Sequence, residues 1–225
     1  MASGMRRHLQ YGLAGIVEGR AVREDGACTA GEFLEALAAG GGEALEGPPR
    51  WDEERRAALL ILHDPACAFE VVVAAAEILW PARAAWALVE LLPGDERHPA
   101  EAALEHLGRP SRPWLPLRLR LSLRPPAELE LAEACALLHA TLLQAWTPAR
   151  REAVRAYRRL GRQADVAREL GVTQQAVSQM LQGARFRELR EVEERLGRWL
   201  AGRPAAGPGF WPLGRRVAAQ TLQNA

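Results

Sequence analysis

A short stretch near residue 180 concentrates polar, uncharged side chains that can each form several hydrogen bonds. They are Gln174, Gln175, Ser178, Gln179 and Gln182. A glutamine amide donates and accepts hydrogen bonds at the same time, which suits the base edges in the major groove of DNA. The apolar residues between them, Val177, Met180 and Leu181, recur at helical spacing. We therefore expect one helix with a buried apolar face and a hydrogen-bonding outer face.

Two short helices and a tight turn are expected to position this face. The first helix covers residues 163–170, and Ala167 supplies the small side chain needed where the two helices cross. Gly171 follows, where a left-handed conformation that favours glycine would end the helix. Thr173 then precedes the second helix, and its hydroxyl can accept a hydrogen bond from a free amide of the first turn.

This pattern resembles the helix-turn-helix of bacterial regulators and of the DNA-binding region 4 of sigma factors. The matching positions are Val166, Ala167, Leu170, Gly171, Val172, Val177 and Met180. The resemblance implies contacts to bases and backbone from Thr173, Gln174, Gln175, Ser178 and Gln179, with Gln182 on the same face. An ordinary helical hairpin with a polar outer face is the alternative, because short patterns also match by chance. We favour DNA binding.

Charge is divided unevenly along the chain, although the formal net charge is only +1. Residues 1–146 hold 14 arginines against 21 acidic residues, a balance of −7, whereas residues 147–203 hold 13 arginines against 7, a balance of +6. All 29 basic residues are arginines, which can bind two phosphate oxygens at once. The basic part contains the predicted reading helix, as binding to the DNA backbone requires. The predicted phosphate contacts are Arg150, Arg151, Arg155, Arg185 and Arg187.

The first 125 residues alternate apolar runs of strand length with helical patterns. Strands are expected within 9–22, 57–62, 84–92 and 117–123, and helices over 30–45, 66–80 and 99–107. This alternation predicts an α/β domain of about four strands, covered by helices on at least one face. We expect parallel pairing in part, with the last strand as an antiparallel edge.

Helical patterns account for most of the remaining chain. They predict a connecting helix within 126–146, a helix over 149–160 capped by Thr147, and a last helix over 186–200. The expected organisation is an α/β N-terminal domain (1–125), the connecting helix, an all-α helix-turn-helix domain of four helices (147–203) and a loose tail (204–225).

A homodimer is also expected, because one reading helix contacts only a few base pairs. The apolar surfaces best able to form its interface are the helix over 127–146 and a stripe through Leu189, Val192 and Leu196.

A second similarity covers the whole chain. Residues 14–20 and 63–66 resemble two strand ends of the SatD-like family of bacterial proteins, which also carry a C-terminal helix-turn-helix. The first domain of that family resembles a nucleotide-cyclase palm, in which paired carboxylates would hold a metal. Here Gly15 stands in place of the first aspartate, and only Asp64 remains of the second motif. One carboxylate cannot hold that metal, so we expect Asp64 to cap a helix and the domain to sense or assemble.

The residues give little support for a metal site, a catalytic site or a membrane span. Cys28, Cys67 and Cys135 are scattered without metal-ligand spacing, which favours free thiols in a reducing cytosol and predicts no zinc site. His63 and Asp64 are sequence neighbours without a nucleophile motif, and no apolar run reaches the roughly 18 residues that span a membrane. The N-terminus lacks a signal-peptide pattern.

These observations together predict a cytoplasmic, non-enzymatic transcription regulator that binds double-stranded DNA. No cofactor, metal or membrane association is expected, and a small-molecule effector is unknown. The alternative is an interaction protein whose helix-turn-helix contacts RNA polymerase or another protein and has little DNA affinity of its own.

Overall fold

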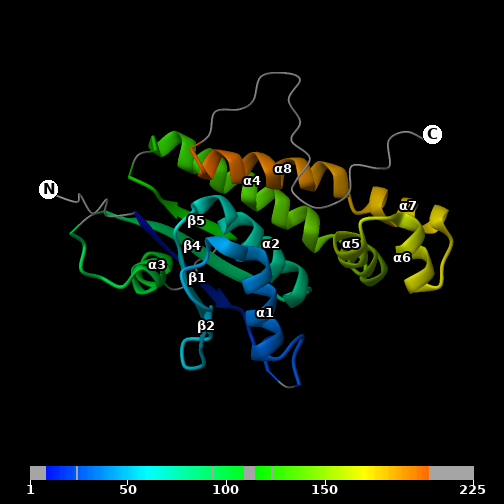
Figure 1. Cartoon of the computed structure of the whole chain (residues 1–225), viewed down its shortest axis with the longest axis horizontal. Helices are drawn as coiled ribbons and strands as arrows, with labels where there is room; N and C mark the ends of the chain where they lie inside the picture. Colours follow the sequence, from blue (N-terminus) through cyan, green and yellow to red (C-terminus); the bar gives the residue numbers. More distant parts are fainter. Residues whose placement is uncertain (1–8, 24, 93, 109–114, 123, 203–225) are drawn as a thin grey trace, which may run out of the picture.

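One mixed sheet forms the centre of the N-terminal part, in a computed structural model that describes residues 9–23, 25–92, 94–108, 115–122 and 124–202. Its strands lie in the order β2-β3-β1-β4-β5 (Figure 1). They are β1 (Gln10–Val17), β2 (Arg50–Asp52), β3 (Ala57–Leu62), β4 (Ala84–Leu91) and β5 (Leu117–Arg120). The predicted tail over 204–225 lies outside the described residues.

The pairing of the strands differs from the expected one. There are five strands, because the short β2 forms a hairpin with β3, and only β4 and β5 pair in parallel. The first strand, β1, lies between β3 and β4 in the sheet. Both β3 and β4 run antiparallel to β1. The last strand is an edge, as predicted, but the prediction that it is antiparallel was wrong. The helical crossover after β4 returns the chain in the same direction.

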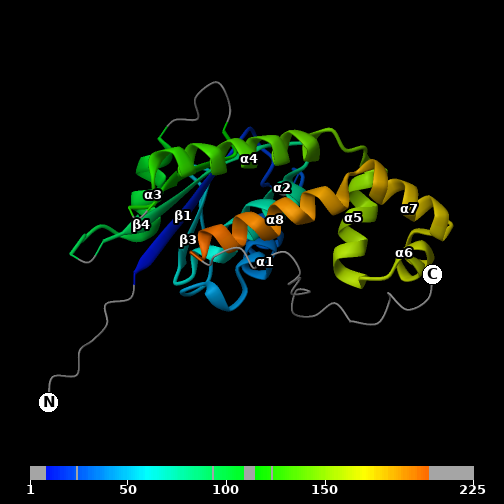
Figure 2. The same ribbon diagram turned by 90° about the horizontal axis from the view of Figure 1, so that it is seen from above.

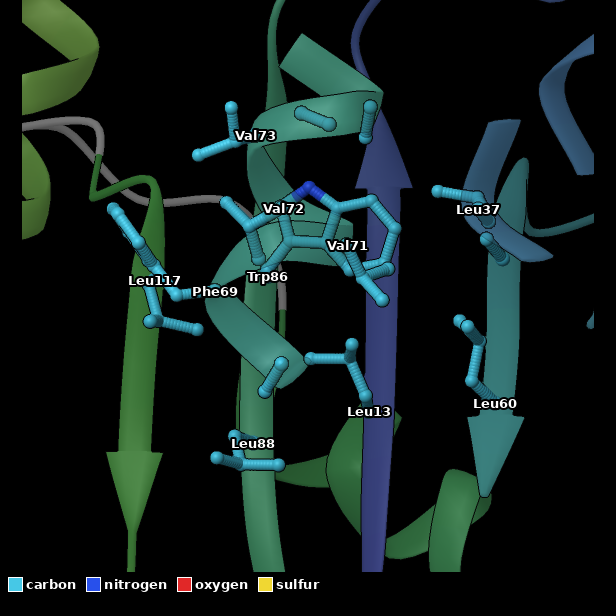
Figure 3. Packing of buried hydrophobic residues seen from close by; sticks show 14 of the residues in the cluster. Leu13, Leu37, Leu60, Phe69, Val71, Val72, Val73, Trp86, Leu88 and Leu117 are labelled. Carbon is cyan, nitrogen blue, oxygen red and sulfur yellow. The ribbon is translucent and has the colours of Figure 1, made fainter. Parts of the chain in front are cut away.

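Helices cover both faces of the sheet, which explains why its central strands are apolar on both sides. Leu13 and Trp86 face α1 (Ala30–Gly41) and α2 (Ala68–Leu79), where they pack against the apolar side of α2 (Figure 3). Ala14 and Val89 face α3 (Pro99–Leu107) on the other side. Every residue of β4 is buried as a result. Because apolar residues point to both faces of the sheet, the sequence of this strand shows no alternation of apolar and polar residues.

The predicted helix starts agree with the structure where a cap was identified. Asp64 accepts a hydrogen bond from Ala66 N at 2.9 Å and begins the short 3₁₀ helix η2 (Pro65–Cys67) before α2. The helix predicted over 30–45 ends at Gly41, and a second 3₁₀ helix, η1 (Gly42–Ala44), follows it. Asp64 is therefore a helix cap, as expected.

The C-terminal part consists of helices. They are α4 (Pro126–Gln144), α5 (Pro148–Leu160), α6 (Gln163–Leu170), α7 (Gln174–Gly183) and α8 (Phe186–Leu200). The group formed by α5, α6 and α7 lies at one end of the molecule, and α8 runs back beside α4 over the sheet domain (Figures 1 and 2). None of the helices in the described part of the chain combines the length and apolar content needed to cross a membrane.

The last helix joins the two parts rather than belonging to one. Leu189 packs in the core of α5–α7, whereas Leu196 and Leu200 pack in the core beneath the sheet. Leu189 is 1% and Leu196 9% exposed. The prediction that the stripe through Leu189, Val192 and Leu196 is open to a second copy was therefore wrong, because the chain itself covers it.

Candidate nucleic-acid interface

The predicted reading residues share one exposed face of α7. Thr173, Gln174, Gln175, Ser178, Gln179 and Gln182 are all exposed, whereas Val177 and Leu181 are buried. Within the residues that the structure describes, the four glutamines and Ser178 have no hydrogen-bond partner for their side chains, so their donors and acceptors point to solvent. The division of this helix into an apolar and a hydrogen-bonding face is as predicted from its periodicity.

The turn before α7 has the predicted geometry. Gly171 has φ 65° and ψ 30°, the left-handed conformation, and its N–H donates to Ala167 O. A Cβ added to Gly171 would meet no atom within 4 Å, so the glycine is required by its backbone angles alone. The Thr173 hydroxyl then accepts from Ala176 N at 3.1 Å and starts α7. These two residues set the direction in which α7 leaves α6.

The core beneath α6 and α7 extends into other elements of the chain. Val166 and Val177 pack with Leu143 and Trp146 near the end of α4, and Trp80 after α2 joins the same cluster. Trp146 Nε1 also donates to Ala184 O, just past α7, at 2.9 Å. The packing is therefore continuous across the predicted boundary at residue 147, and the orientation of α7 is tied to the sheet domain.

The five predicted phosphate contacts fall into different environments. Arg155 and Arg187 are exposed and without a partner in the described part of the molecule, and Arg185 is exposed 3.6 Å from Glu188. The guanidinium of Arg150 lies against Gly183, since a Cβ there would come within 2.8 Å of its Nε. Arg150 and Arg185 thus lie at the C-terminal end of α7, whereas Arg155 is close enough to Glu32 on α1 to add to the lowering of its pKa that the Thr29 hydrogen bonds cause.

Arg151 has a different role from the one predicted. Its Nε donates to Glu77 O at 2.7 Å and its Nη2 to Ile78 O at 3.0 Å, which are carbonyl groups at the C-terminal end of α2. Its guanidinium also lies 5.8 Å from the centre of the Trp80 ring. Arg151 therefore braces α5 against α2, and its charge is not presented to solvent as a phosphate contact needs.

The sequence analysis did not single out Arg162, an exposed arginine of the C-terminal part. Arg162 stands at the N-cap of α6 and, among the residues described, has no ion-pair partner. Its place directly before a predicted helix was a usable signal, because basic side chains there can reach phosphates close to the helix N-terminus.

A buried ionic network fixes α5 to three other helices. Arg158 Nε donates to Glu77 Oε1 at 2.7 Å, and its Nη2 donates to Glu193 Oε1 at 2.7 Å. His139 Nε2 donates to the same Glu193 oxygen at 3.0 Å, and Arg190 Nη1 lies 3.1 Å from Oε2. These residues come from α2, α4, α5 and α8. Glu77 and Glu193, charged positions inside otherwise apolar helix faces, were the signal in the sequence.

The network has opposite effects on its two carboxyl groups. Burial would raise the pKa of Glu193, but hydrogen bonds from His139 and Arg158 lower it to about 2. Burial dominates at Glu77 and raises its pKa, although Arg158, its side-chain hydrogen-bond partner among the described residues, lowers it. Arg158 is desolvated, yet the two carboxylates hold its pKa above the ordinary value. Glu193 is thus the ionised centre of the network.

The part of the chain that the structure describes contains no group of three or more His, Cys, Asp or Glu side chains that could hold a metal ion. Burial raises the pKa of the Cys67 thiol to about 12, which keeps it protonated. Residues 14–20 and 63–66 also lie at opposite ends of a strand pair, because Ile16 is opposite Ala57 whereas Tyr11 is opposite Leu62.

Gly15 has a structural explanation in this sheet. A Cβ there would lie 2.5 Å from the indole of Trp86, its cross-strand neighbour. A carboxylate at this position is thus incompatible with the core as it is packed.

The candidate site is the outer face of α7, a row of amides and one hydroxyl without partners in the described residues, with Arg150 and Arg185 at its C-terminal end. It can donate and accept hydrogen bonds and attract anions. Comparisons of the chain with protein-family models, curated proteins and solved structures found no match.

Proposed function

We propose that the chain is a DNA-binding transcription regulator in which α6 and α7 form a helix-turn-helix. One observation carries this proposal: the exposed face of α7 holds four glutamines and a serine, all without partners in the described residues, and no charge. Glutamine can pair with adenine through two hydrogen bonds, which discriminates between bases by about 1–3 kcal/mol.

The neighbouring helices argue against an ordinary solvated surface on α7. The exposed side of α8 carries Arg–Glu pairs such as Arg195 with Glu191, and Arg168 of α6 pairs with Asp165 at 3.1 Å. The two helices next to α7 therefore carry charged pairs on their solvent-facing sides, whereas the exposed face of α7 carries none. An uncharged face flanked by arginines suits a duplex, where bases lie between two phosphate backbones.

We also propose that the regulator is a homodimer that pairs through α4. Leu131, Leu138 and Leu142 are 66%, 67% and 45% exposed, and Ala134 is exposed between them. The spacing of residues 131, 134 and 138 is that of a coiled-coil seam. In an antiparallel pair, Leu138 of one copy would face Ala134 of the other, so large and small side chains alternate. The single acidic residue between 131 and 145, Glu133, is turned inward and accepts from Leu119 N at 2.7 Å.

Selection of bound duplexes from a random pool tests the function directly. We expect the full chain to enrich one sequence, arranged as two half-sites if α4 forms the dimer. Recovery of random sequences only, with binding lost at moderate salt, would contradict base reading. It would favour the view that α7, with the exposed Val172 beside it, contacts another protein.

A further inference from the structure

A basic cavity lies in the sheet domain, apart from the α7 face. It has a volume of about 300 Å³ and opens where β1 ends, between the loop that follows β1 and the turn that joins β2 to β3. Arg20 and Arg23 come from the loop, and Arg56 comes from the turn. Glu53 is the carboxylate of the lining. Three guanidinium groups thus gather in a part of the chain that carries an acidic balance.

The hydrogen bonds of the lining leave positive charge available. Glu53 accepts from Trp51 Nε1 at 2.6 Å, and Arg56 Nη1 donates to Gly19 O at 2.7 Å. Arg23 lies 3.4 Å from Asp25, an exposed pair. Arg20 has neither a hydrogen bond nor an ion pair within the described ranges. Among the described residues, no carboxylate therefore lies within ion-pair distance of Arg20 or Arg56, and the three guanidinium groups outnumber the one carboxylate of the lining.

The backbone of Arg56 is held in an unusual conformation at this site. Its φ is 51°, a left-handed value that residues other than glycine rarely adopt. Its carbonyl oxygen accepts from Val17 N at 3.0 Å, which ties the turn to the end of β1. This arrangement directs the guanidinium across the cavity to Gly19. Strained residues of this kind concentrate where a ligand is held.

The floor and wall of the cavity are apolar. Val17 and Val22 are almost completely buried beneath it, and the Trp51 indole forms part of its wall. Trp51 is held in place by its bond to Glu53 and by an edge-on contact with Phe33 at 5.7 Å. At this volume, which is at the lower end for ligand sites, the cavity suits a molecule with one ring.

We propose that this cavity binds a small organic anion. Its carboxylate or phosphate group lies among Arg20, Arg23 and Arg56, and its ring lies against the indole of Trp51. Arginine binds both kinds of anionic group through paired hydrogen bonds. This site goes beyond DNA binding and does not depend on it.

Isothermal titration calorimetry on the full chain tests this site with four probes: phenyl phosphate, benzoate, inorganic phosphate and benzyl alcohol. We expect saturable binding of phenyl phosphate or benzoate with a Kd of about 1 mM or below. Inorganic phosphate should bind more weakly, because it lacks the ring, and benzyl alcohol should not bind. The preferred ring-bearing anion distinguishes a phosphate from a carboxylate ligand.

Two variants locate the binding. Arg20→Gln and Arg23→Gln should each weaken it by about tenfold or more, whereas Arg195→Gln, on the exposed side of α8, should leave it unchanged. Arg20 has no partner among the residues that the structure describes, so its variant should keep the melting temperature of the parent. No saturable heat with either ring-bearing anion would overturn the proposal, and so would binding that both variants retain. Equal affinity for inorganic phosphate and phenyl phosphate would overturn the ring site.

Discussion

Glu193→Gln removes one charge from the buried network and keeps the shape of the side chain. Only 3% of the Glu193 side chain is exposed. Its pKa is lowered from 4.5 to about 2, since hydrogen bonds from His139 and Arg158 outweigh burial. One pKa unit corresponds to about 1.4 kcal/mol, so the shift amounts to about 3 kcal/mol of stability. Removing one partner of a buried ion pair costs about 3–5 kcal/mol, which agrees.

Urea unfolding of the full chain, followed by circular dichroism near neutral pH, measures this loss. We expect Glu193→Gln to lower the free energy of unfolding by about 3 kcal/mol. The matched control is Glu191→Gln on the same helix, where the carboxylate pairs with Arg195, whose side chain is 69% exposed. Exposed pairs contribute about 0–1 kcal/mol, so the control should change little.

The pH dependence gives a second, independent readout. Because the pKa of Glu193 is lower in the folded chain, its stabilisation is complete above pH 4.5 and is lost as the pH falls from there towards about 2. The pKa of Glu77 is raised by burial and, in smaller part, by the charge of Glu193, so Glu193→Gln relieves part of this opposing effect and slightly reduces the loss of stability near neutral pH. The difference in the free energy of unfolding between the parent and Glu193→Gln should therefore become smaller as the pH falls from 4.5 towards about 2. A gap independent of pH, or a loss equal to that of Glu191→Gln, would refute the reasoning.

Further predictions concern the proposed helix-turn-helix and the proposed dimer. Gly171→Val should destabilise the chain by about 1–3 kcal/mol, because a β-branched residue is strained at positive φ; an unchanged unfolding midpoint would count against it. In salt titrations of DNA binding, Arg155→Gln and Arg187→Gln should each lower the slope of log affinity against log salt by about one. Arg151→Gln should instead reduce stability and leave the slope unchanged; a lowered slope would return it to the interface. Leu138→Glu should give a monomer in sedimentation equilibrium, and a parent protein already monomeric with and without DNA would exclude the α4 dimer.

Local patterns in the sequence were sufficient for most of the elements. The helices over 99–107 and 186–200 begin and end where their periodicity places them. The short β2 was missed because three residues carry no measurable alternation. Strand direction could not be read locally, since it depends on which strands pair, and the insertion of β1 between β3 and β4 joins segments far apart in the chain.

The candidate site shows the same limit. Val177 and Gln174 were assigned to opposite faces of α7 because periodicity decides this within one helix. Arg151 and Arg155, four residues apart on α5, could not be separated, since the distinction depends on where α2 ends. The pairing of His139 with Glu193 joins residues 54 positions apart and leaves no local trace.

The most direct measurement compares the affinity of the full chain for its selected duplex and for a scrambled duplex of equal length. Gln174→Ala and Gln175→Ala should each weaken specific binding by about 1–3 kcal/mol while affinity for the scrambled duplex is unchanged. Gln10→Ala, at the start of β1, is the control and should bind both duplexes as the parent does. If both glutamine variants on α7 keep the full preference for the selected sequence, α7 does not read bases through its first turn.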